Sequence, residues 1–197
     1  MRGLVVVAHP RAESYTRALA DRAVCGLLAA GHEVEQLDLY GLDFQAAMSP
    51  EEWRAYEGDE PILDPIVAAH ARSVQRVELL VFVYPTWWSG LPAILKGWLE
   101  RVLVPGVGFR IDEQTGKVQP ALTDVRMIVG ISTYDSSRSR VAATNDNGRR
   151  TLTRALRMNC GARTRTRWYG MYSLGTSTEV ERADFAATVE RAMLELR

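Results

Sequence analysis

The stretch LLVFVYPTWWSGLPAILKGWLERV, which runs from Leu79 to Val102, decides the fold. It begins with an unbroken apolar run from Leu79 to Tyr84, which is typical of a strand buried on both faces of a sheet. Pro85 is expected to end that strand, because proline has no backbone N–H to donate to a neighbouring strand. The stretch therefore predicts a central strand of an α/β sheet.

A helix is expected to follow this strand within the same stretch. Ser89 or Gly90 can cap a helix that Leu91 and Pro92 begin, since a proline in the first turn loses no hydrogen bond. Apolar residues then recur at helical spacing and make one apolar face: Ile94, Leu95, Trp98, Leu99 and Val102. A buried strand followed by an amphipathic helix indicates an α/β unit.

The loop between the strand and the helix carries two adjacent tryptophans. It consists of Thr86, Trp87, Trp88 and Ser89 and follows the carboxyl end of the strand, the edge at which open α/β sheets bind ligands. Large aromatic residues are generally well buried, so one alternative places both tryptophans in the core or at a subunit interface. Their small polar neighbours favour instead a platform for a flat ligand.

From Pro85 to Val102 the sequence resembles the signature of the NAD(P)H:quinone reductase family of flavodoxin-like flavoproteins, in which an aromatic loop leads into a P-A-I-L-K-G-W helix. The resemblance implies a three-layer α/β fold with a five-stranded parallel sheet in the order 2-1-3-4-5, formed by residues 1–197 as a single domain. It also implies a bound flavin, either FMN or FAD, with NAD(P)H as electron donor and a quinone-like planar molecule as acceptor. Pro85 to Ser89 would then line the flavin ring.

A second loop follows the short apolar strand expected at Leu4–Ala8. The segment HPRAESYT joins this strand to a helix that Gly31 closes, and it lacks the glycine patterns of dinucleotide-binding Rossmann folds and of P-loop kinases. Hydroxyl groups and free N–H groups at a helix N-terminus suit a phosphate, although Ser14 serving only as the helix cap is the alternative. The H-P-x-x-x-S spacing resembles the flavin-phosphate loop of the same family. Its candidate binding residues are His9, Arg11, Ser14, Tyr15 and Thr16.

The third polar loop follows the strand expected at Val125–Ile131. By the resemblance it meets the polar rim of the flavin, through Thr133, Tyr134, Asp135 and Ser136. The better-known quinone reductases have a T-T-G-G-type turn here, followed by a tyrosine and a histidine implicated in hydride transfer. This sequence has Tyr134 and Asp135 where glycines are expected, and no histidine follows. We therefore expect hydride transfer without a histidine proton donor, with Tyr134 as the candidate catalytic residue.

The segment from Gly41 to Pro61 has the composition of loop and short helix, with Ser49 and Glu52 spaced for a capping box. A linker between two domains is the alternative. The resemblance places this region near a partner subunit, and its aromatic residues Phe44 and Trp53 are exposed unless something covers them. A homodimer is therefore the expected assembly.

Composition and charge exclude several partners. The formal net charge is zero, which argues against nucleic acid and anionic membrane surfaces, and no apolar segment is long enough to span a bilayer. His32 and His70 are expected to face solvent and Cys25 to pack in the core, with no metal-ligand spacing among them. The isolated cysteines indicate a reducing, cytoplasmic setting. Nine arginines between Arg138 and Arg167 predict a solvated basic surface, with contact to the phosphates of the nicotinamide donor as the alternative.

Together these motifs predict a flavin-dependent NAD(P)H oxidoreductase. The donor and the acceptor would use one site in turn, which implies ping-pong kinetics, and the flavin would supply the hydride chemistry. The first alternative is a flavin-binding regulatory subunit of the kind found beside potassium-efflux channels. The second, an electron-transfer flavodoxin, is disfavoured because flavodoxins are usually strongly acidic and this chain is neutral.

Overall fold

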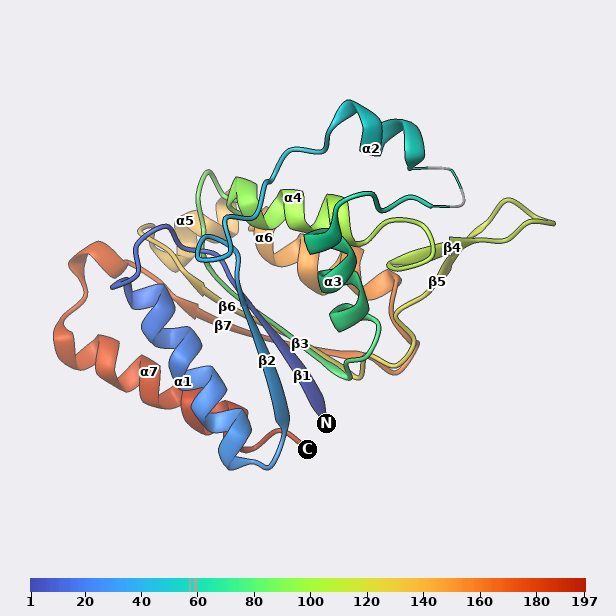
Figure 1. The fold of residues 1–197 in the computed structure, drawn as a ribbon. Helices are drawn as coiled ribbons and strands as arrows, with labels where there is room; N and C mark the ends of the chain where they lie inside the picture. Colours follow the sequence, from blue (N-terminus) through green and yellow to red (C-terminus); the bar gives the residue numbers. More distant parts are fainter. Residues whose placement is uncertain (57, 59) are drawn as a thin grey trace.

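A computed structural model describes residues 1–56, 58 and 60–197, and within them the chain forms a five-stranded parallel sheet with helices on both faces (Figure 1). The strands are β1 (Arg2–Val7), β2 (Glu33–Asp38), β3 (Leu79–Pro85), β6 (Met127–Thr133) and β7 (Arg165–Met171). Their spatial order is β2-β1-β3-β6-β7, and every neighbouring pair is parallel. This is the order of the predicted flavodoxin-like fold, so the prediction of fold class is confirmed.

Helices cover both faces of the sheet. On one face, α1 (Tyr15–Ala29) and α7 (Glu179–Leu194) lie side by side (Figure 1). The other face carries α3 (Pro65–Val74), α4 (Ala93–Val102), and a helical segment formed by α6 (Asn147–Arg150) and the π-helical residues Thr151–Leu156. A short helix, α5 (Arg138–Ala143), follows β6. Among the residues that the structure describes, none of the helices combines the length and the apolar character that a membrane crossing requires.

The central strands β3 and β6 are buried along their whole length. Alternate side chains point to opposite faces, so Leu80 and Phe82 pack toward α3 and α4, whereas Val81 and Val83 pack toward α1 and α7. Trp98 of α4 lies edge-on against Phe82, with ring centroids 6.1 Å apart. Burying a side chain of this size contributes about 1.5–3 kcal/mol. The apolar runs of the sequence therefore form a two-sided core.

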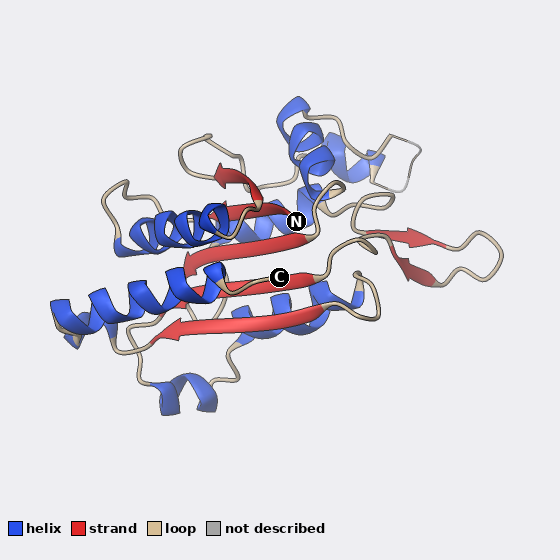
Figure 2. Cartoon of the chain, turned by 90° about the horizontal axis from the view of Figure 1, so that it is seen from below, coloured by secondary structure: helices blue, strands red, loops and turns tan. Residues whose placement is uncertain are grey.

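Two excursions leave this three-layer body. The first contains α2 (Pro50–Ala55), which lies above α4 in Figure 1, and the predicted capping box between Ser49 and Glu52 is confirmed. The second is an antiparallel hairpin of β4 (Phe109–Ile111) and β5 (Val118–Pro120), which projects from one side of the molecule (Figure 2).

The predicted helix start at Ser89 or Gly90 is wrong. Trp88 and Ser89 have left-handed backbone conformations, with φ of 49° and 56°, and Trp87 and Gly90 pair backbone to backbone across them. A tight turn of the kind that joins hairpin strands therefore occupies these positions, and the helix begins only at Ala93. Two adjacent non-glycine residues with positive φ are uncommon, so nothing in the sequence indicated this turn. Ser89 and Gly90 are common helix-cap residues, and they indicated a helix start instead.

Both histidine predictions are wrong, because both side chains are buried. His32 lies with its Nε2 3.1 Å from the carbonyl oxygen of Leu196, just beyond α7. His70 accepts a hydrogen bond from the indole N–H of Trp98 (3.3 Å), and its ring stacks on Phe44 with centroids 5.6 Å apart. Phe44, which was expected to be exposed unless something covers it, is buried within the chain itself. Buried polar side chains find such partners far along the chain, where local patterns give no sign of them.

Cys25, which was expected to pack in the core, is exposed on the outer side of α1. The buried positions of this helix include Ala23 and Leu27. A displacement of two residues corresponds to about 200° around an α-helix. Cys25 therefore points away from the stripe that its neighbours bury.

Candidate active site

The loops that follow β1, β3 and β6 meet at the carboxyl edge of the sheet. The backbone N–H of Thr86 donates to the carbonyl of Thr133 (2.8 Å), which joins the second loop to the third. The rings of His9 and Trp87 lie with centroids 6.2 Å apart, which brings the first loop beside the second. A cavity of about 300 Å³, here termed the edge cavity, is lined by Thr86, Trp88, Ser89, Tyr134, Asp135, Ser136, Arg140, Val141 and Thr144. The structure thus brings residues of all three predicted loops together.

The loop after β1 presents the N-terminus of α1. Ser14 caps the helix, and its hydroxyl accepts the N–H of Arg17 (3.3 Å). The first N–H groups of a helix have no partner within it, so those of Tyr15 and Thr16 can donate to an anion. Arg11 is exposed in the same loop. Ser14 is therefore the cap that the sequence predicts, and the same turn of helix offers the donors that a phosphate needs.

Other polar groups of this loop are engaged by the protein itself. Arg17 forms an ion pair with Asp38 and donates to the carbonyl of His9 (3.3 Å). The hydroxyl of Tyr15 donates to the carbonyl of Arg182 on α7 (2.7 Å). These contacts fix the loop against β2 and α7. Among the described residues no ion pair engages Arg11, so its exposed guanidinium can meet an anionic ligand.

His9 lies between this loop and the tryptophans, and it is neutral at pH 7. Burial lowers the pKa of its imidazole below the usual value, and the nearby charges of Arg17 and Arg11 act in the same direction. Its Nδ1 accepts the backbone N–H of Arg11 (3.1 Å), so the neutral ring carries its proton on Nε2. His9 is therefore an N–H donor from Nε2 at neutral pH.

The aromatic turn, residues 86–90, holds both tryptophans at the surface. Trp88 is fully exposed at the tip, and Trp87 is 41% exposed. The N–H groups of Asn147 and Gly148 donate to the carbonyl of Ser89, at 3.1 and 3.4 Å, so the residues at the start of α6 support the turn. Neither tryptophan belongs to the core, and Trp88 lines the edge cavity.

The loop after β6 begins with a buried tyrosine. Tyr134 is only 2% exposed, and its hydroxyl donates to both carboxylate oxygens of Asp146, at 3.1 and 3.2 Å. Its ring stacks on that of Tyr172, with centroids 4.6 Å apart. Burial raises the pKa of the Tyr134 hydroxyl well above its usual value, and the charge of Asp146 adds to the shift. The hydroxyl therefore stays protonated across the physiological range.

Two residues of this cluster were missed by the sequence analysis. Asp146 lies just before α6 with a left-handed φ of 42°, and burial raises the pKa of its carboxyl. The hydroxyl of Ser132 lies 2.8 Å from that of Thr86, inside the edge of the sheet. The Asn-Asp-Asn-Gly composition around Asp146 marks a turn, but nothing local indicates that its carboxylate meets Tyr134.

The remaining predicted residues lie around the same edge. Pro85 and Thr133 are the buried last residues of β3 and β6, while Asp135 is exposed and Ser136 is half-buried. Among the described residues, no group of three or more His, Cys, Asp or Glu side chains is placed to hold a metal ion. The site offers hydroxyl, indole and backbone N–H groups, which suit a flat organic ligand with a polar rim.

Comparison with known proteins identifies the family. A family model described as flavodoxin-like fold matches residues 1–193. The chain belongs to this family. The match includes the three loops of the site together with the whole sheet.

A curated relative is similar over part of its length. NAD(P)H dehydrogenase [quinone] 1 of Rattus norvegicus is 33% identical over 123 residues, which cover 55% of this chain and 45% of the relative. The chain thus spans about half the length of the curated relatives that it matches. This similarity confirms the resemblance to quinone reductases that the sequence motifs indicate.

Solved structures of flavodoxin-like proteins share the fold. NAD(P)H:quinone oxidoreductase from Methanothermobacter marburgensis aligns with a TM-score of 0.82 and 23% identity, over 100% of this chain and 99% of that chain. An FMN-dependent NADH-azoreductase from Bacillus anthracis, solved in complex with FMN, aligns with a TM-score of 0.72 and 16% identity, over 98% and 97%. At these identities the likeness is one of fold.

Proposed function

We propose that this protein is a flavin-dependent NAD(P)H oxidoreductase that reduces quinones or similar flat acceptors. The observation that carries the proposal is the meeting of three loops at one sheet edge: a helix N-terminus capped by Ser14, an exposed aromatic turn, and a loop rich in hydroxyl groups. Open α/β sheets bind their ligands at this edge. The likeness to a quinone dehydrogenase and to an FMN-dependent azoreductase supports the same chemistry.

The residues present fit a flavin. Its phosphate would accept hydrogen bonds from the Ser14 hydroxyl, from the N–H groups of Tyr15 and Thr16, and from Arg11. FMN and FAD both carry a phosphate at the end of the ribityl chain, so the same loop would hold either one. When bound, the flavin would take a hydride from NAD(P)H and pass it to the acceptor.

The chain's own side chains would orient the reactants. Trp87 and Trp88 offer flat faces on which a planar molecule can stack. Thr86 and Ser136 place hydroxyl groups on the wall of the edge cavity, where they can bind a polar ring edge. Because one exposed platform would serve the donor and the acceptor in turn, we expect ping-pong kinetics.

The proposed reaction, NAD(P)H + H⁺ + quinone → NAD(P)⁺ + hydroquinone, takes up a proton that some group must deliver. Tyr134 lines the edge cavity and keeps its hydroxyl proton at neutral pH. Asp146 lies directly behind that hydroxyl, at hydrogen-bond distance. We therefore keep Tyr134 as the candidate proton donor; its hydroxyl would have to turn from Asp146, to which it donates in this structure, toward the substrate.

The test begins with the purified protein. Release of the flavin and chromatography would identify FMN or FAD, and oxidation of NADH and NADPH would then be followed with a soluble naphthoquinone. We expect bound flavin, turnover, and parallel double-reciprocal plots. A protein that binds no flavin, or a flavoprotein that oxidises neither donor, would contradict the proposal.

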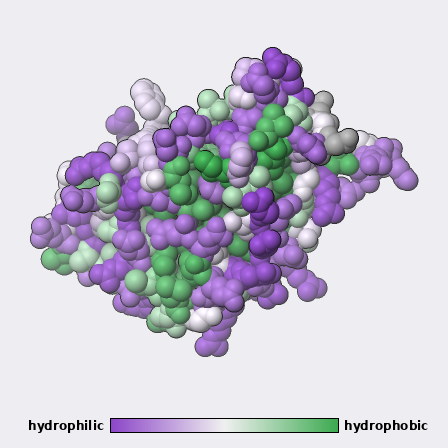
Figure 3. All heavy atoms as spheres, viewed as in Figure 1, coloured by the Kyte–Doolittle hydropathy of each residue, from purple (hydrophilic) through white to green (hydrophobic). Residues whose placement is uncertain are grey.

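We also propose a homodimer in the cytoplasm as the working form. Apolar side chains gather at the surface near α2 and α3 (Figure 3), and the exposed ones of this region include Trp53, Leu63 and Ile66. Two-fold dimers are the commonest oligomers, and the free Cys25 and Cys160 suit a reducing compartment. A monomeric mass by light scattering at micromolar concentration, with activity intact, would contradict the dimer.

A further inference from the structure

A second cavity lies on the other side of α5 from the edge cavity. It has a volume of about 430 Å³ and is bordered by α5, by the helical segment that begins at Asn147, and by Tyr172. Val141 of α5 borders both cavities, so this helix forms the wall between them. Four arginines line the second cavity: Arg138, Arg149, Arg150 and Arg154. It is termed the arginine groove here.

The arginine groove concentrates positive charge. Within the part of the chain that the structure describes, none of its four guanidinium groups forms an ion pair. Asp146, the acidic residue in the lining, accepts the hydroxyl of Tyr134 with both carboxylate oxygens. Since the net charge of the whole chain is zero, the positive charge of the groove is a local excess.

Arginines without acidic partners suit phosphate groups. The planar guanidinium donates two parallel hydrogen bonds to phosphate oxygens, a geometry that a simple cation lacks. Of the two nicotinamide donors, NADPH carries a 2′-phosphate in addition to the pyrophosphate, which adds about two negative charges to those of NADH. Four arginines therefore match the charge of NADPH better than that of NADH.

We propose that the arginine groove binds the 2′-phosphate of NADPH while the nicotinamide meets the flavin at the mouth of the edge cavity, and that it makes the protein prefer NADPH to NADH. The inference rests on the proposed function, since it concerns the donor of that reaction. The two cavities are adjacent through Val141, so one extended dinucleotide can reach both. Arg149, whose guanidinium lies over the ring of Trp168 at 5.8 Å from its centroid, is held in place within the groove.

A second basic hollow provides a matched control. It lies at the amino ends of the strands, at the opposite edge of the sheet, and is lined by Arg163 and Arg165 among others. Removing two arginines there changes the net charge of the protein by the same amount as removing two from the groove. The control therefore separates an effect of the groove from an effect of overall charge.

The experiment compares Arg150→Gln/Arg154→Gln with Arg163→Gln/Arg165→Gln. In the groove variant we expect kcat/KM for NADPH to fall by about tenfold to a hundredfold, the effect of losing hydrogen bonds to a charged group. The value for NADH should change by less than about threefold, because NADH lacks the 2′-phosphate. The control variant should keep both values. No loss for NADPH, or an equal loss for both donors, would overturn the inference.

Calorimetry on the flavin-loaded protein gives a readout without turnover. Adenosine 2′,5′-bisphosphate should bind the wild type and the control variant more tightly than the groove variant, whereas adenosine 5′-monophosphate should distinguish them much less. Equal affinity of the bisphosphate for all three proteins would overturn the inference, even where quinone reduction is intact and the proposed function stands. If the wild type oxidises neither donor, the proposed function fails, and the calorimetry alone decides whether the groove binds these phosphates.

Discussion

The hydroxyl of Tyr134 donates to both carboxylate oxygens of Asp146, at 3.1 and 3.2 Å, across 12 residues of chain. This contact joins the loop after β6 to the start of α6. The start of α6 in turn supports the aromatic turn, through two hydrogen bonds to the carbonyl of Ser89. Two of the three loops of the site are thus coupled through one buried pair of side chains.

Asp146 should make the stability of the protein depend on pH. Burial raises the pKa of its carboxyl in the folded state above the unfolded value of about 3.9. Between these two pKa values the folded state binds more protons than the unfolded state, so this group lowers the free energy of unfolding as the pH rises. Asp146→Asn keeps an acceptor for Tyr134 and cannot ionise. The variant should therefore gain stability relative to the wild type between about pH 4 and pH 7.

Urea unfolding at several pH values within that window measures the difference between the two proteins. Tyr134→Phe is the companion variant, because it leaves the buried carboxylate without its donor. It should destabilise the protein by about 1–3 kcal/mol, and by more at pH 7 than at acidic pH, where the carboxyl is neutral. A wild-type-to-variant difference that stays constant with pH would show that Asp146 does not titrate in this range.

Ser14→Ala should weaken flavin binding by about 1–2 kcal/mol, because it removes a hydroxyl that donates to a charged phosphate. It also removes the cap of α1, which costs about 1 kcal/mol of stability. Ser49→Ala is the matched control, since it removes the cap of α2, outside the three loops of the site. Fluorimetric titration of the apoprotein with flavin compares the two. Unchanged flavin affinity in Ser14→Ala would exclude this loop from the phosphate site.

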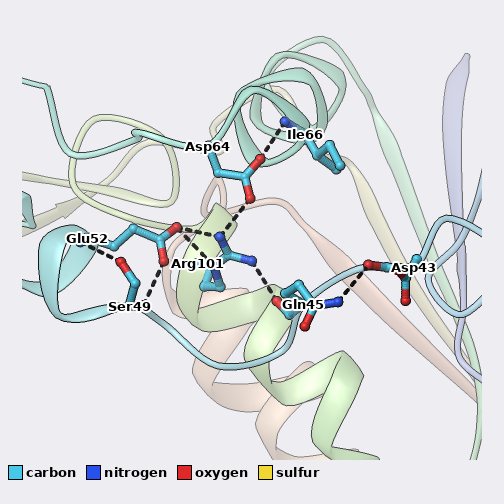
Figure 4. Close-up of polar contacts among 7 residues, drawn as sticks. All are labelled: Asp43, Gln45, Ser49, Glu52, Asp64, Ile66 and Arg101. Atoms are coloured by element: carbon cyan, nitrogen blue, oxygen red, sulfur yellow. Dashed lines mark hydrogen bonds and ion pairs between the residues drawn. The ribbon is translucent and has the colours of Figure 1, made fainter.

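A buried ion cluster holds the α2 excursion against α4 (Figure 4). Arg101, which is 5% exposed, donates to Glu52 (3.0 Å), to Asp64 (2.9 Å) and to the carbonyl of Gln45 (2.6 Å). Arg101→Met should destabilise the protein by about 3–5 kcal/mol, because it leaves Glu52 buried and charged without its partner. The double variant Arg101→Met/Glu52→Gln should recover much of this loss.

Urea unfolding of these variants checks the prediction, with Lys96→Met as the control. Lys96 pairs with Glu100 on the exposed side of the same helix, and such surface pairs contribute at most about 0.5 kcal/mol. Equal losses of unfolding free energy in Arg101→Met and Lys96→Met would show that the buried ion cluster stabilises the protein no more than the exposed pair does. A double variant that is less stable than Arg101→Met would mean that Glu52 stabilises the fold through other contacts.

The parts of the fold that could be predicted have local signals. The apolar run of β3, the cap at Ser14 and the capping box at Ser49 each lie within a few residues of sequence, and all three are present. Parallel strands in a sheet end at the same edge, so the sequence alone places the loops after β1 and β6 beside the aromatic turn.

The parts that could not be predicted depend on partners chosen across the chain. Arg101 and Glu52 are 49 residues apart, and neither position carries a sign of the other. The same holds for Asp146, whose role follows only from the position of Tyr134. The turn at Trp88 could not be predicted for a different reason. Its positive φ occurs at a non-glycine residue, and such residues rarely adopt that conformation.

Trp88 should contribute to acceptor binding and not to stability. It is fully exposed at a φ of 49°, a conformation that costs a non-glycine residue about 1–2 kcal/mol. Trp88→Gly removes this strain together with the stacking face. We expect an unchanged or higher free energy of unfolding and a roughly tenfold rise in KM for a flat quinone. Ferricyanide, which cannot stack, is the control acceptor, and an equal rise in its KM would contradict a stacking role.

Hydride transfer should proceed without a histidine proton donor. The chain has three histidines, and two of them, His32 and His70, are buried against Leu196 and Trp98, away from the edge cavity. His9 does lie at the site, but burial lowers its pKa, so the ring is neutral at pH 7. Burial raises the pKa of the Tyr134 hydroxyl, which therefore keeps its proton at and below pH 7. If none of these histidines delivers the proton, the rate of flavin reduction should show no inflection of a histidine between about pH 5.5 and 7.5.

Stopped-flow reduction of the bound flavin by NADPH, for the wild type and for His9→Ala, tests this expectation across that pH range. Both proteins should give a flat profile, because His9 does not deliver the proton and Tyr134 keeps its own throughout this range. Tyr134→Phe should slow the reaction by no more than about 10²–10⁴-fold, the range for loss of a general acid. An inflection at or below about pH 6.5 that is present in the wild type and disappears in His9→Ala would show that His9 takes part in proton transfer. Tyr134 would then lose its place as the proton donor.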